Sequence, residues 1–246
     1  YQAFSLEREP QLPALALQYA DYAIWQRRWL EAGEGERQLD YWRQQLGEEH
    51  PLLEVAPDFA RPLTQSFEGQ TLSFDFGADL SRQLNAFARS QGISLFMLVL
   101  AGFSLFVSRH AGQRDIRVGV PNANRGRAEV EGLIGFFVNT QVLRCEVDER
   151  GSFTDLLARV REASFGAQAH QELPFEQLVD ELVAERTLGH NPLFQVKFNQ
   201  NVGMQKQRAM ALPGLSVAEY PLDKDGTHFD LALDITDDGT LIHGQM

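Results

Sequence analysis

Positions 133–144 of this chain, Leu-Ile-Gly-Phe-Phe-Val-Asn-Thr-Gln-Val-Leu-Arg, constrain its fold more than any other stretch. The run of apolar, β-branched and aromatic residues predicts a strand that enters a buried sheet. Gly135 interrupts the run, which indicates a bulge or the close approach of another group to the backbone. Taken alone, the segment is typical of a core strand with a polar half-turn at Asn139.

The patterns on either side predict an α/β fold. Helices are expected at 15–30 and 34–46, and a proline-rich loop at 50–65 joins them to the rest of the chain. From residue 70 onward we expect strand 70–76, helix 78–91, buried helix 94–109, strand 115–120, the central strand, a helix from Ser152, helix 174–184, and strands 193–199, 215–220, 229–236 and 241–246. This order favours a two-layer sandwich in which helices cover one face of a mixed sheet.

The composition argues against some classes of binding partner. The net charge is −12, whereas a nucleic acid or an anionic membrane surface would require a basic patch. The most apolar run, 93–108, is shorter than the roughly 20 residues that cross a bilayer. The single cysteine, Cys145, cannot form an internal disulfide and lies in an alternating strand pattern, so we interpret it as a structural thiol. Residues 1–10 lack the apolar region of a signal peptide, so a cytoplasmic location is expected.

Four blocks of the sequence, taken in order, resemble a known family. They are Tyr-Ala-Asp-Tyr-Ala-Ile-Trp at 19–25, Ile-Gly-Phe-Phe-Val-Asn-Thr-Gln at 134–141 followed by Leu-Arg, His-Gln-Glu-Leu-Pro-Phe-Glu at 170–176, and the segment 186–193 that ends in Asn-Pro-Leu. Together they resemble the condensation domains of nonribosomal peptide synthetases. The departures are Tyr22 for Phe, Ile24 for Val, Glu172 for Asp, and 187–190 where the family usually has an Asp and a Ser-Arg pair.

The catalytic block of that family, His-His-x-x-x-Asp-Gly, is not found in this sequence. Four residues after five of the six histidines stand Glu54, Arg114, Pro174, Phe194 and Ala232, and His243 has too little chain behind it. The resemblance therefore implies that the chain begins downstream of the catalytic histidine. We expect no catalytic residue here and no activity from the chain alone.

The resemblance also implies an architecture and a reaction. Condensation domains consist of two lobes similar to chloramphenicol acetyltransferase, so 1–66 would be the helical tail of the N-terminal lobe with its linker, and 67–246 an incomplete C-terminal lobe. The implied reaction is acyl transfer, in which an acceptor aminoacyl thioester attacks a donor acyl or peptidyl thioester to form an amide bond. Phosphopantetheine arms of donor and acceptor carrier proteins deliver both substrates, and no cofactor binds the lobe directly. The absent N-terminal lobe is a further partner.

Two residues of the central segment are candidates for the substrate tunnel that the resemblance implies. A bare backbone at Gly135 would leave room for the phosphopantetheine arm, and the carbonyl and amide of Asn139 could orient a substrate. The remaining residues are interpreted as motif or structural positions: Asp21, Trp25, Phe137, Arg144, His170, Pro174, Phe175, Glu176, Asn191 and Pro192. Asp21 has no neighbouring histidine or carboxylate, so a helix-stabilising or exposed role is favoured. His170 could act as a base, but no acid follows it nearby, and a structural or capping role is preferred.

The roles of two further pairs of polar residues remain open. Arg125 and Arg127 could meet a phosphate or could be solvated only. His228 and Asp230 share one face of a predicted strand and could suit a metal, but two ligands are too few to predict a site.

Two alternatives to the main interpretation also remain. The chain could belong to an epimerisation domain or another acyltransferase of the same fold, or it could be a lobe that docks carrier proteins without chemistry.

Overall fold

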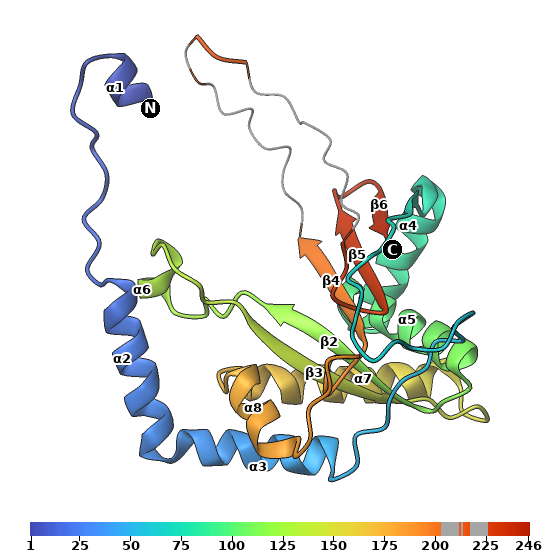
Figure 1. Cartoon of the computed structure of the whole chain (residues 1–246). Coiled ribbons are helices and arrows are strands. Elements are labelled where there is room, and N and C mark those ends of the chain that lie inside the picture. Colours follow the sequence, from blue (N-terminus) through green and yellow to red (C-terminus); the bar gives the residue numbers. More distant parts are fainter. Residues whose placement is uncertain (203–211, 213, 217–225) are drawn as a thin grey trace.

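The computed structural model describes residues 1–202, 212, 214–216 and 226–246 (Figure 1). Within these residues the strands are β1 (Ser73–Asp75), β2 (Asp115–Asn122), β3 (Asn139–Glu146), β4 (Val196–Val202), β5 (Leu231–Asp237) and β6 (Ile242–Gln245). They form one sheet in the order β1-β6-β5-β4-β2-β3. The pairs β2–β4 and β4–β5 are parallel, and the other pairs are antiparallel. The predicted mixed sheet is therefore confirmed.

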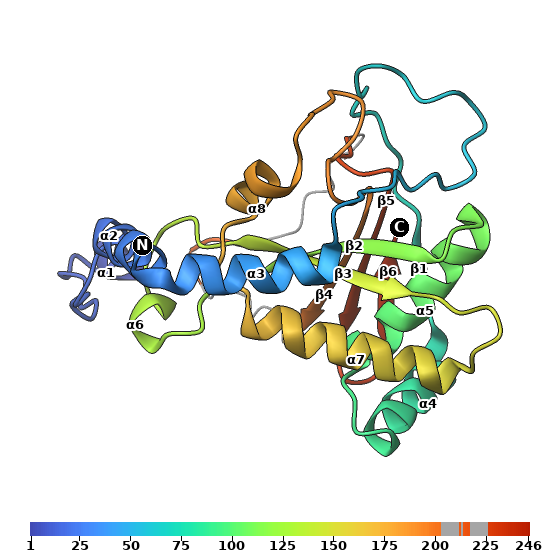
Figure 2. The same ribbon diagram turned by 90° about the horizontal axis from the view of Figure 1, so that it is seen from below.

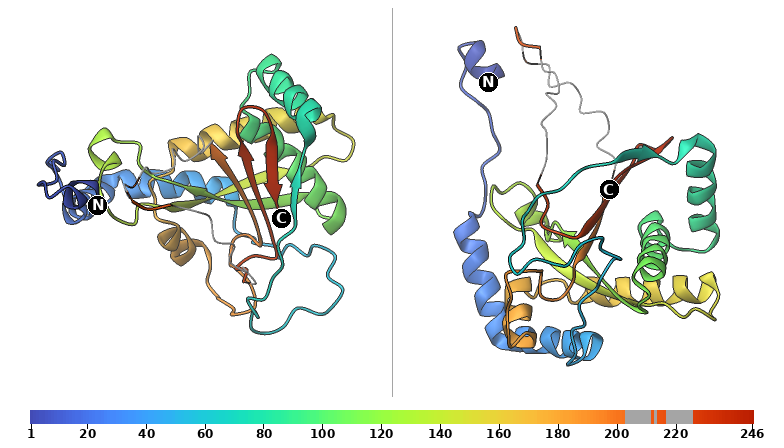
Figure 3. Two further views of the ribbon diagram at one scale, coloured as in Figure 1. Left: turned by 90° about the horizontal axis from the view of Figure 1, so that it is seen from above. Right: turned by 45° about the vertical axis from the view of Figure 1, so that its right-hand side comes forward.

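Three helices cover one face of the sheet: α4 (Gly77–Ser90), α5 (Leu95–Ala111) and α7 (Phe153–Ala169) (Figures 2 and 3). Two more helices, α3 (Gly35–Leu46) and α8 (Phe175–Leu182), lie near β2 and β3, and α3 runs between α7 and α8 in Figure 2. One large core joins these layers. Its fully buried side chains include Leu100, Val118, Val142 and Phe198.

The predicted buried helix is α5, and its ends follow from local chemistry. The Ser94 side chain accepts a hydrogen bond from the Met97 backbone N–H at 3.2 Å, which caps the first turn. Gly112 ends the helix with φ of 65°, a conformation that glycine adopts without steric cost. Most of the helix is buried, and Phe106 and His110 lie on its exposed side.

The N-terminal region forms an arm beside the main body. Helix α1 (Gln2–Ser5) is exposed, and α2 (Tyr19–Trp29) continues through the π-helical segment η1 (Leu30–Glu34) into α3. Gly33 has φ of 108°, and the chain bends sharply here (Figure 1). A second, smaller hydrophobic cluster connects α2 with the short helix α6 (Ala128–Glu131) and the loop after it; its members are Tyr22, Val130, Leu133 and Phe137, with Trp25 packed against them.

The central strand begins later than predicted. Residues 133–138 form a loop, and β3 starts at Asn139, which pairs with Asn122 at the end of β2. The prediction of a strand over the first half of the segment was therefore wrong, because β2 ends at this point and offers 133–138 no pairing partner. In this loop Leu133 and Phe137 enter the small cluster instead, whereas Ile134 and Phe136 are 93% and 75% exposed.

Other boundaries differ by a few residues. Helix α2 begins at Tyr19 rather than at residue 15, β1 is shorter than predicted, and β2 continues past Pro121 to Asn122. Proline is tolerated in β2 because its pairing with β4 covers only Val118 and Gly119, so Pro121 pairs with β3 alone. The strand predicted at 215–220 and the loop predicted at 201–213 fall largely outside the described residues.

In the part of the chain that the structure describes, no single helix is long and apolar enough to cross a membrane. The pair α4 and α5 passes the same test only when taken together, and the two helices are bent by 107°.

Candidate functional site

Two of the four sequence blocks meet at the turn between α7 and α8, and the side chain of Asn139 joins them. Its Nδ2 donates to the carbonyl oxygens of Gln171 at 2.9 Å and Leu173 at 2.7 Å. Its Oδ1 accepts from the backbone N–H groups of Thr140 at 2.9 Å and Phe175 at 3.0 Å. The carboxamide thus uses both donor hydrogens and its oxygen on the protein itself, and it attaches the start of β3 to the start of α8.

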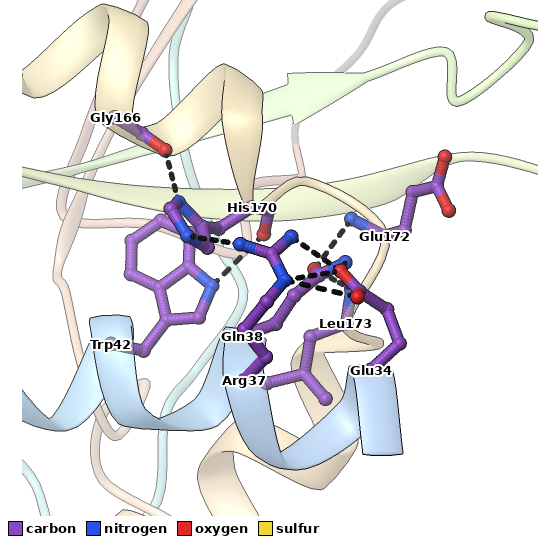
Figure 4. Close-up of polar contacts among 8 residues, drawn as sticks. All are labelled: Glu34, Arg37, Gln38, Trp42, Gly166, His170, Glu172 and Leu173. Carbon is purple, nitrogen blue, oxygen red and sulfur yellow. Dashed lines mark hydrogen bonds and ion pairs between the residues drawn. The ribbon is translucent and has the colours of Figure 1, made fainter. Parts of the chain in front are cut away.

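A second carboxamide holds the same turn from α3. Gln38 is 1% exposed, and its Oε1 accepts from the backbone N–H groups of Glu172 at 3.1 Å and Leu173 at 2.8 Å (Figure 4). Its Nε2 donates to Glu34 Oε1 at 3.2 Å. We call residues 170–175 with Gln38 and Asn139 the amide clamp. It satisfies polar backbone groups of a turn that lies between a helix and a sheet.

His170 is the C-cap of α7, and both nitrogens of its ring have partners. Nδ1 donates to the Gly166 carbonyl at 2.8 Å, and Nε2 accepts from Arg37 at 3.0 Å, so these contacts select the neutral Nδ1–H tautomer (Figure 4). The ring stacks on Tyr41 with 4.0 Å between centroids. Burial, with a smaller contribution from Glu162, raises the pKa of Tyr41 to about 12. In this arrangement His170 attaches α7 to α3 and has no free nitrogen with which to take a substrate proton.

Gly135 is the site of a close approach, but the approaching group is an aromatic ring. A Cβ added to Gly135 would lie 2.3 Å from Tyr19 Cδ2. The Tyr19 hydroxyl also donates to the Phe136 carbonyl at 2.8 Å. The space that a tunnel role for Gly135 requires is therefore filled by a residue of the first block.

Gly135→Ala is expected to lower the free energy of unfolding by about 1–2 kcal/mol, because the new methyl group must displace the Tyr19 ring. Urea unfolding followed by fluorescence measures this loss. Gly132→Ala in the same loop is the control, since its Cβ would come no closer than 3.8 Å to Leu15 Cδ2. Equal stabilities of the two variants would contradict the packing.

Arginines 125 and 127 both contact the small hydrophobic cluster around Tyr22. Arg125 Nη1 donates to the carbonyls of Val130 at 2.6 Å and Leu133 at 2.9 Å, and the guanidinium carbon lies 4.2 Å from the centre of the Phe137 ring. Arg127 lies at the same distance over Trp25. The phosphate hypothesis gains no support from these contacts. Arg125 instead holds the loop that presents Ile134 and Phe136 to solvent.

The first block, residues 19–25, forms the start of α2 and lines part of a hollow at the surface. Asp21 Oδ2 accepts from the Gln18 backbone N–H at 2.9 Å in a capping box at the start of α2. Trp25 stacks on Trp29 with 5.6 Å between centroids. A hollow of about 420 Å³ lies along this face, lined by Asp21, Ile24, Trp25, Arg28 and Trp29.

Arg144 and the neighbouring Arg117 bind the end of α3 to the sheet. Arg144 Nε donates to Asp115 Oδ1 at 2.8 Å, and its Nη1 donates to the Gln45 carbonyl at 3.2 Å. Arg117 is 4% exposed and donates to the carbonyls of Leu46 at 3.0 Å and Glu49 at 2.8 Å. These guanidinium groups satisfy carbonyls at and just beyond the C-terminus of the helix, where a positive charge is favourable.

The block ending in Asn-Pro-Leu contacts the segment that leads into β5. Asn191 Nδ2 donates to the His228 carbonyl at 2.6 Å, which joins this block to the start of β5. Pro192 follows in the same turn, before β4. Asp230 pairs with Arg61, with Nη1 to Oδ1 at 2.9 Å. Among the described residues, no group of three or more His, Cys, Asp or Glu side chains could hold a metal ion.

The helix predicted at 174–184 is α8, which begins at Phe175, one residue later than expected, and ends at Leu182. Pro174 is its N-cap, Phe175 packs on Phe194 with 5.6 Å between centroids, and Glu176 lies in the first turn. Sequence reasoning missed Gln38, Arg117 and the contact between Tyr19 and Gly135. A polar residue on the apolar face of the predicted 34–46 helix was the one available signal for Gln38, because a buried carboxamide requires partners.

The comparisons with known proteins agree with this geometry. The family model for the condensation domain matches residues 1–245. A linear gramicidin synthase of Brevibacillus parabrevis is 49% identical over 236 residues, which are 95% of this chain and 5% of that protein. The chain thus spans a small part of this curated relative.

Solved structures show the same fold. The X-domain from teicoplanin biosynthesis is 27% identical, with a TM-score of 0.86, and the match covers 99% of this chain and 57% of that one. The condensation domain of the monacolin K polyketide synthase MokA is 21% identical, with a TM-score of 0.82, over 100% of this chain and 58% of that one. Since the family model matches nearly the whole sequence and the fold agrees, the chain belongs to the condensation domain family.

Proposed function

We propose that this chain is part of a nonribosomal peptide synthetase condensation domain that forms an amide bond between two carrier-bound substrates. The observation that carries the proposal is the family match over residues 1–245, together with the 49% identity to a linear gramicidin synthase. In the proposed reaction the amine of the acceptor aminoacyl thioester attacks the carbonyl of the donor thioester. The new C–N bond forms, the C–S bond breaks, and the donor thiol leaves with a proton.

The proposed role of this chain is orientation rather than covalent chemistry. A free α-amine has a pKa near roughly 8, so a useful fraction is already unprotonated, and holding two thioesters in line can supply much of the acceleration. We propose that the catalytic histidine is supplied from outside residues 1–246. The engagement of both His170 nitrogens supports this division, because that histidine has no free acceptor for the amine proton.

We further propose that 67–246 form the C-terminal lobe and that 1–66 belong to the preceding lobe and its linker. The bend at Gly33 separates α2 from the main core, whereas α3 packs into that core through Leu39, Trp42 and Leu46. The exposed side chains Ile134 and Phe136 lie on the loop 133–138 and would be covered in an intact domain. The carrier proteins and their phosphopantetheine arms are the proposed partners.

We propose that Asn139 affects the orientation of the substrate only indirectly. Its side chain is occupied by the amide clamp, so any effect on the reaction passes through the turn at 170–175 that it positions. Gly135 would likewise act by seating Tyr19 and not by leaving an open space.

A reconstitution experiment tests the proposed function. The chain alone and the intact condensation domain that contains it are each incubated with donor and acceptor carriers loaded with aminoacyl thioesters, and dipeptide is detected by mass spectrometry. We expect product from the intact domain and none from the chain alone. Replacing the second histidine of the upstream His-His-x-x-x-Asp-Gly block in the intact domain should abolish the product. Peptide formed by residues 1–246 alone would overturn the division of roles, and an inactive intact domain would overturn the function.

A further inference from the structure

His50 lies at the point where α3, β2 and α8 meet. Its Nδ1 is 2.7 Å from Nη1 of Arg117 on β2, and its Nε2 is 3.0 Å from the carbonyl oxygen of Leu182, the last residue of α8. Arg117 also holds the carbonyls of Leu46 and Glu49, which precede His50 at the end of α3. One imidazole therefore connects the C-terminal ends of two helices to a buried arginine of the sheet.

These partners allow only one form of the ring. The Leu182 carbonyl is an acceptor, so Nε2 carries the hydrogen, and the arginine N–H is a donor, so Nδ1 must present its lone pair. Protonation of Nδ1 replaces this lone pair with an N–H that points at a cation. From this geometry we propose that His50 is a pH-sensitive attachment, which holds the end of α3 and the start of the 50–65 segment to α8 only while its imidazole is neutral.

The charged groups around the ring determine the direction of the effect. Burial, followed by the positive charge of Arg117, lowers the pKa of His50, whereas the Leu182 carbonyl and Asp115 act in the opposite sense. Asp115 is shared, because it pairs with Arg117 at 3.2 Å and with Arg144 of β3 at 2.8 Å. On α8 the nearby acid, Glu181, pairs with Arg43 of α3 at 3.3 Å. Each of these carboxylates already has an arginine partner.

The sign of the pH dependence follows. Because the folded state lowers the pKa of His50 below that of a free histidine, the unfolded chain binds this proton more readily than the folded chain. The contribution of His50 to stability is complete at neutral pH and above. It is lost as the pH falls from the unfolded pKa through the lower folded pKa.

His170 provides an internal comparison. It too accepts from an arginine, Arg37, and donates to a carbonyl, that of Gly166. Arg37, however, is itself ion-paired with Glu34, and its hydrogen bond is the main cause that lowers the pKa of that carboxyl. A carboxylate therefore balances the guanidinium charge at that end of α3. His50 lies beyond the other end of α3, and the charged group in contact with it is the buried guanidinium of Arg117.

His50→Gln tests the proposal, because a glutamine can accept from Arg117 and donate to Leu182 but does not titrate. Thermal unfolding of residues 1–246 is measured from about pH 7.5 to about pH 5 for the wild type, for His50→Gln, and for His110→Gln as the control on an exposed histidine of α5. The fall in Tm of the wild type and of the control should exceed that of His50→Gln by about 3 °C, the usual effect of losing one buried hydrogen bond in a chain of this size. Parallel falls for all three proteins would overturn the proposal.

A second measurement on the wild type does not depend on the variant folding. The nitrogen shifts of ¹⁵N-labelled histidines at neutral pH should identify His50 as the Nε2–H tautomer, and its titration should lie at lower pH than that of the histidines in the urea-unfolded chain. On acidification, hydrogen exchange should increase at 47–53 and at 180–184. An Nδ1–H tautomer, or titration of His50 at the same pH as the histidines of the unfolded chain, would also overturn the proposal.

Discussion

Replacing Asn139 by alanine is expected to lower the free energy of unfolding by about 3 kcal/mol, because each buried backbone group left without a partner costs about 1–3 kcal/mol. The substitution removes the donors to the carbonyls of Gln171 and Leu173 and the acceptor for the Phe175 N–H. Urea unfolding measures the loss. Hydrogen exchange should also increase in α8, because the Phe175 N–H at its first turn loses its partner.

Asn199→Ala is the matched control for this prediction. Asn199 donates to Asp234 Oδ1 at 2.9 Å and to Asn201 Oδ1 at 3.3 Å, so both partners are side chains and no backbone group is orphaned. We expect a loss below about 1 kcal/mol. In the intact domain, Asn139→Ala should also reduce the rate of peptide formation, because the turn at 170–175 would move from its position. Unchanged stability and unchanged turnover together would reject the amide clamp.

Trp42→Ala should cost about 4 kcal/mol, the usual range for removing a buried tryptophan being about 3–5 kcal/mol. The Trp42 side chain is 2% exposed and belongs to the main core. Its Nε1 donates to the His170 carbonyl at 3.0 Å (Figure 4). The substitution therefore opens a cavity beneath α3 and leaves the carbonyl at the end of α7 without its donor. Urea unfolding followed by circular dichroism measures the loss.

Trp29→Ala makes the same chemical change at the end of α2. Trp29 is half-buried, belongs to neither hydrophobic cluster, and stacks mainly on Trp25. We expect a loss below about 2 kcal/mol, because much of the space it leaves is open to solvent. Similar losses for the two tryptophan variants would mean that α3 does not depend on the core contact of Trp42.

Much of the fold could be predicted from local patterns. The helix from Ser152 begins with the predicted capping box, in which Asp155 Oδ2 accepts from the Ser152 backbone N–H at 2.9 Å. The predicted half-buried strand is β5, with Leu233 and Ile235 buried as their alternation indicates. These features depend on residues a few positions apart, so short stretches of sequence are enough to predict them.

The candidate site was harder to predict because its contacts join distant parts of the chain. Asn139 stood out as a polar step in an apolar run, but its partners at Gln171, Leu173 and Phe175 lie 32–36 positions away. Gln38 reaches the same turn across 134 positions. A carboxamide can bind a substrate or a backbone equally well, and only the neighbour that the fold places beside it decides between the two.

The sequence by itself determined the family resemblance, the alternation of helices and strands, and the ends of helices such as α5, because these depend on residue type and short spacing. The tertiary structure alone decided that 133–138 leave the sheet, that the Tyr19 ring occupies the space beside Gly135, and that both nitrogens of His170 are engaged. The physical reason is that a strand requires a partner strand, and a polar side chain takes whichever donor or acceptor the packed chain brings within reach.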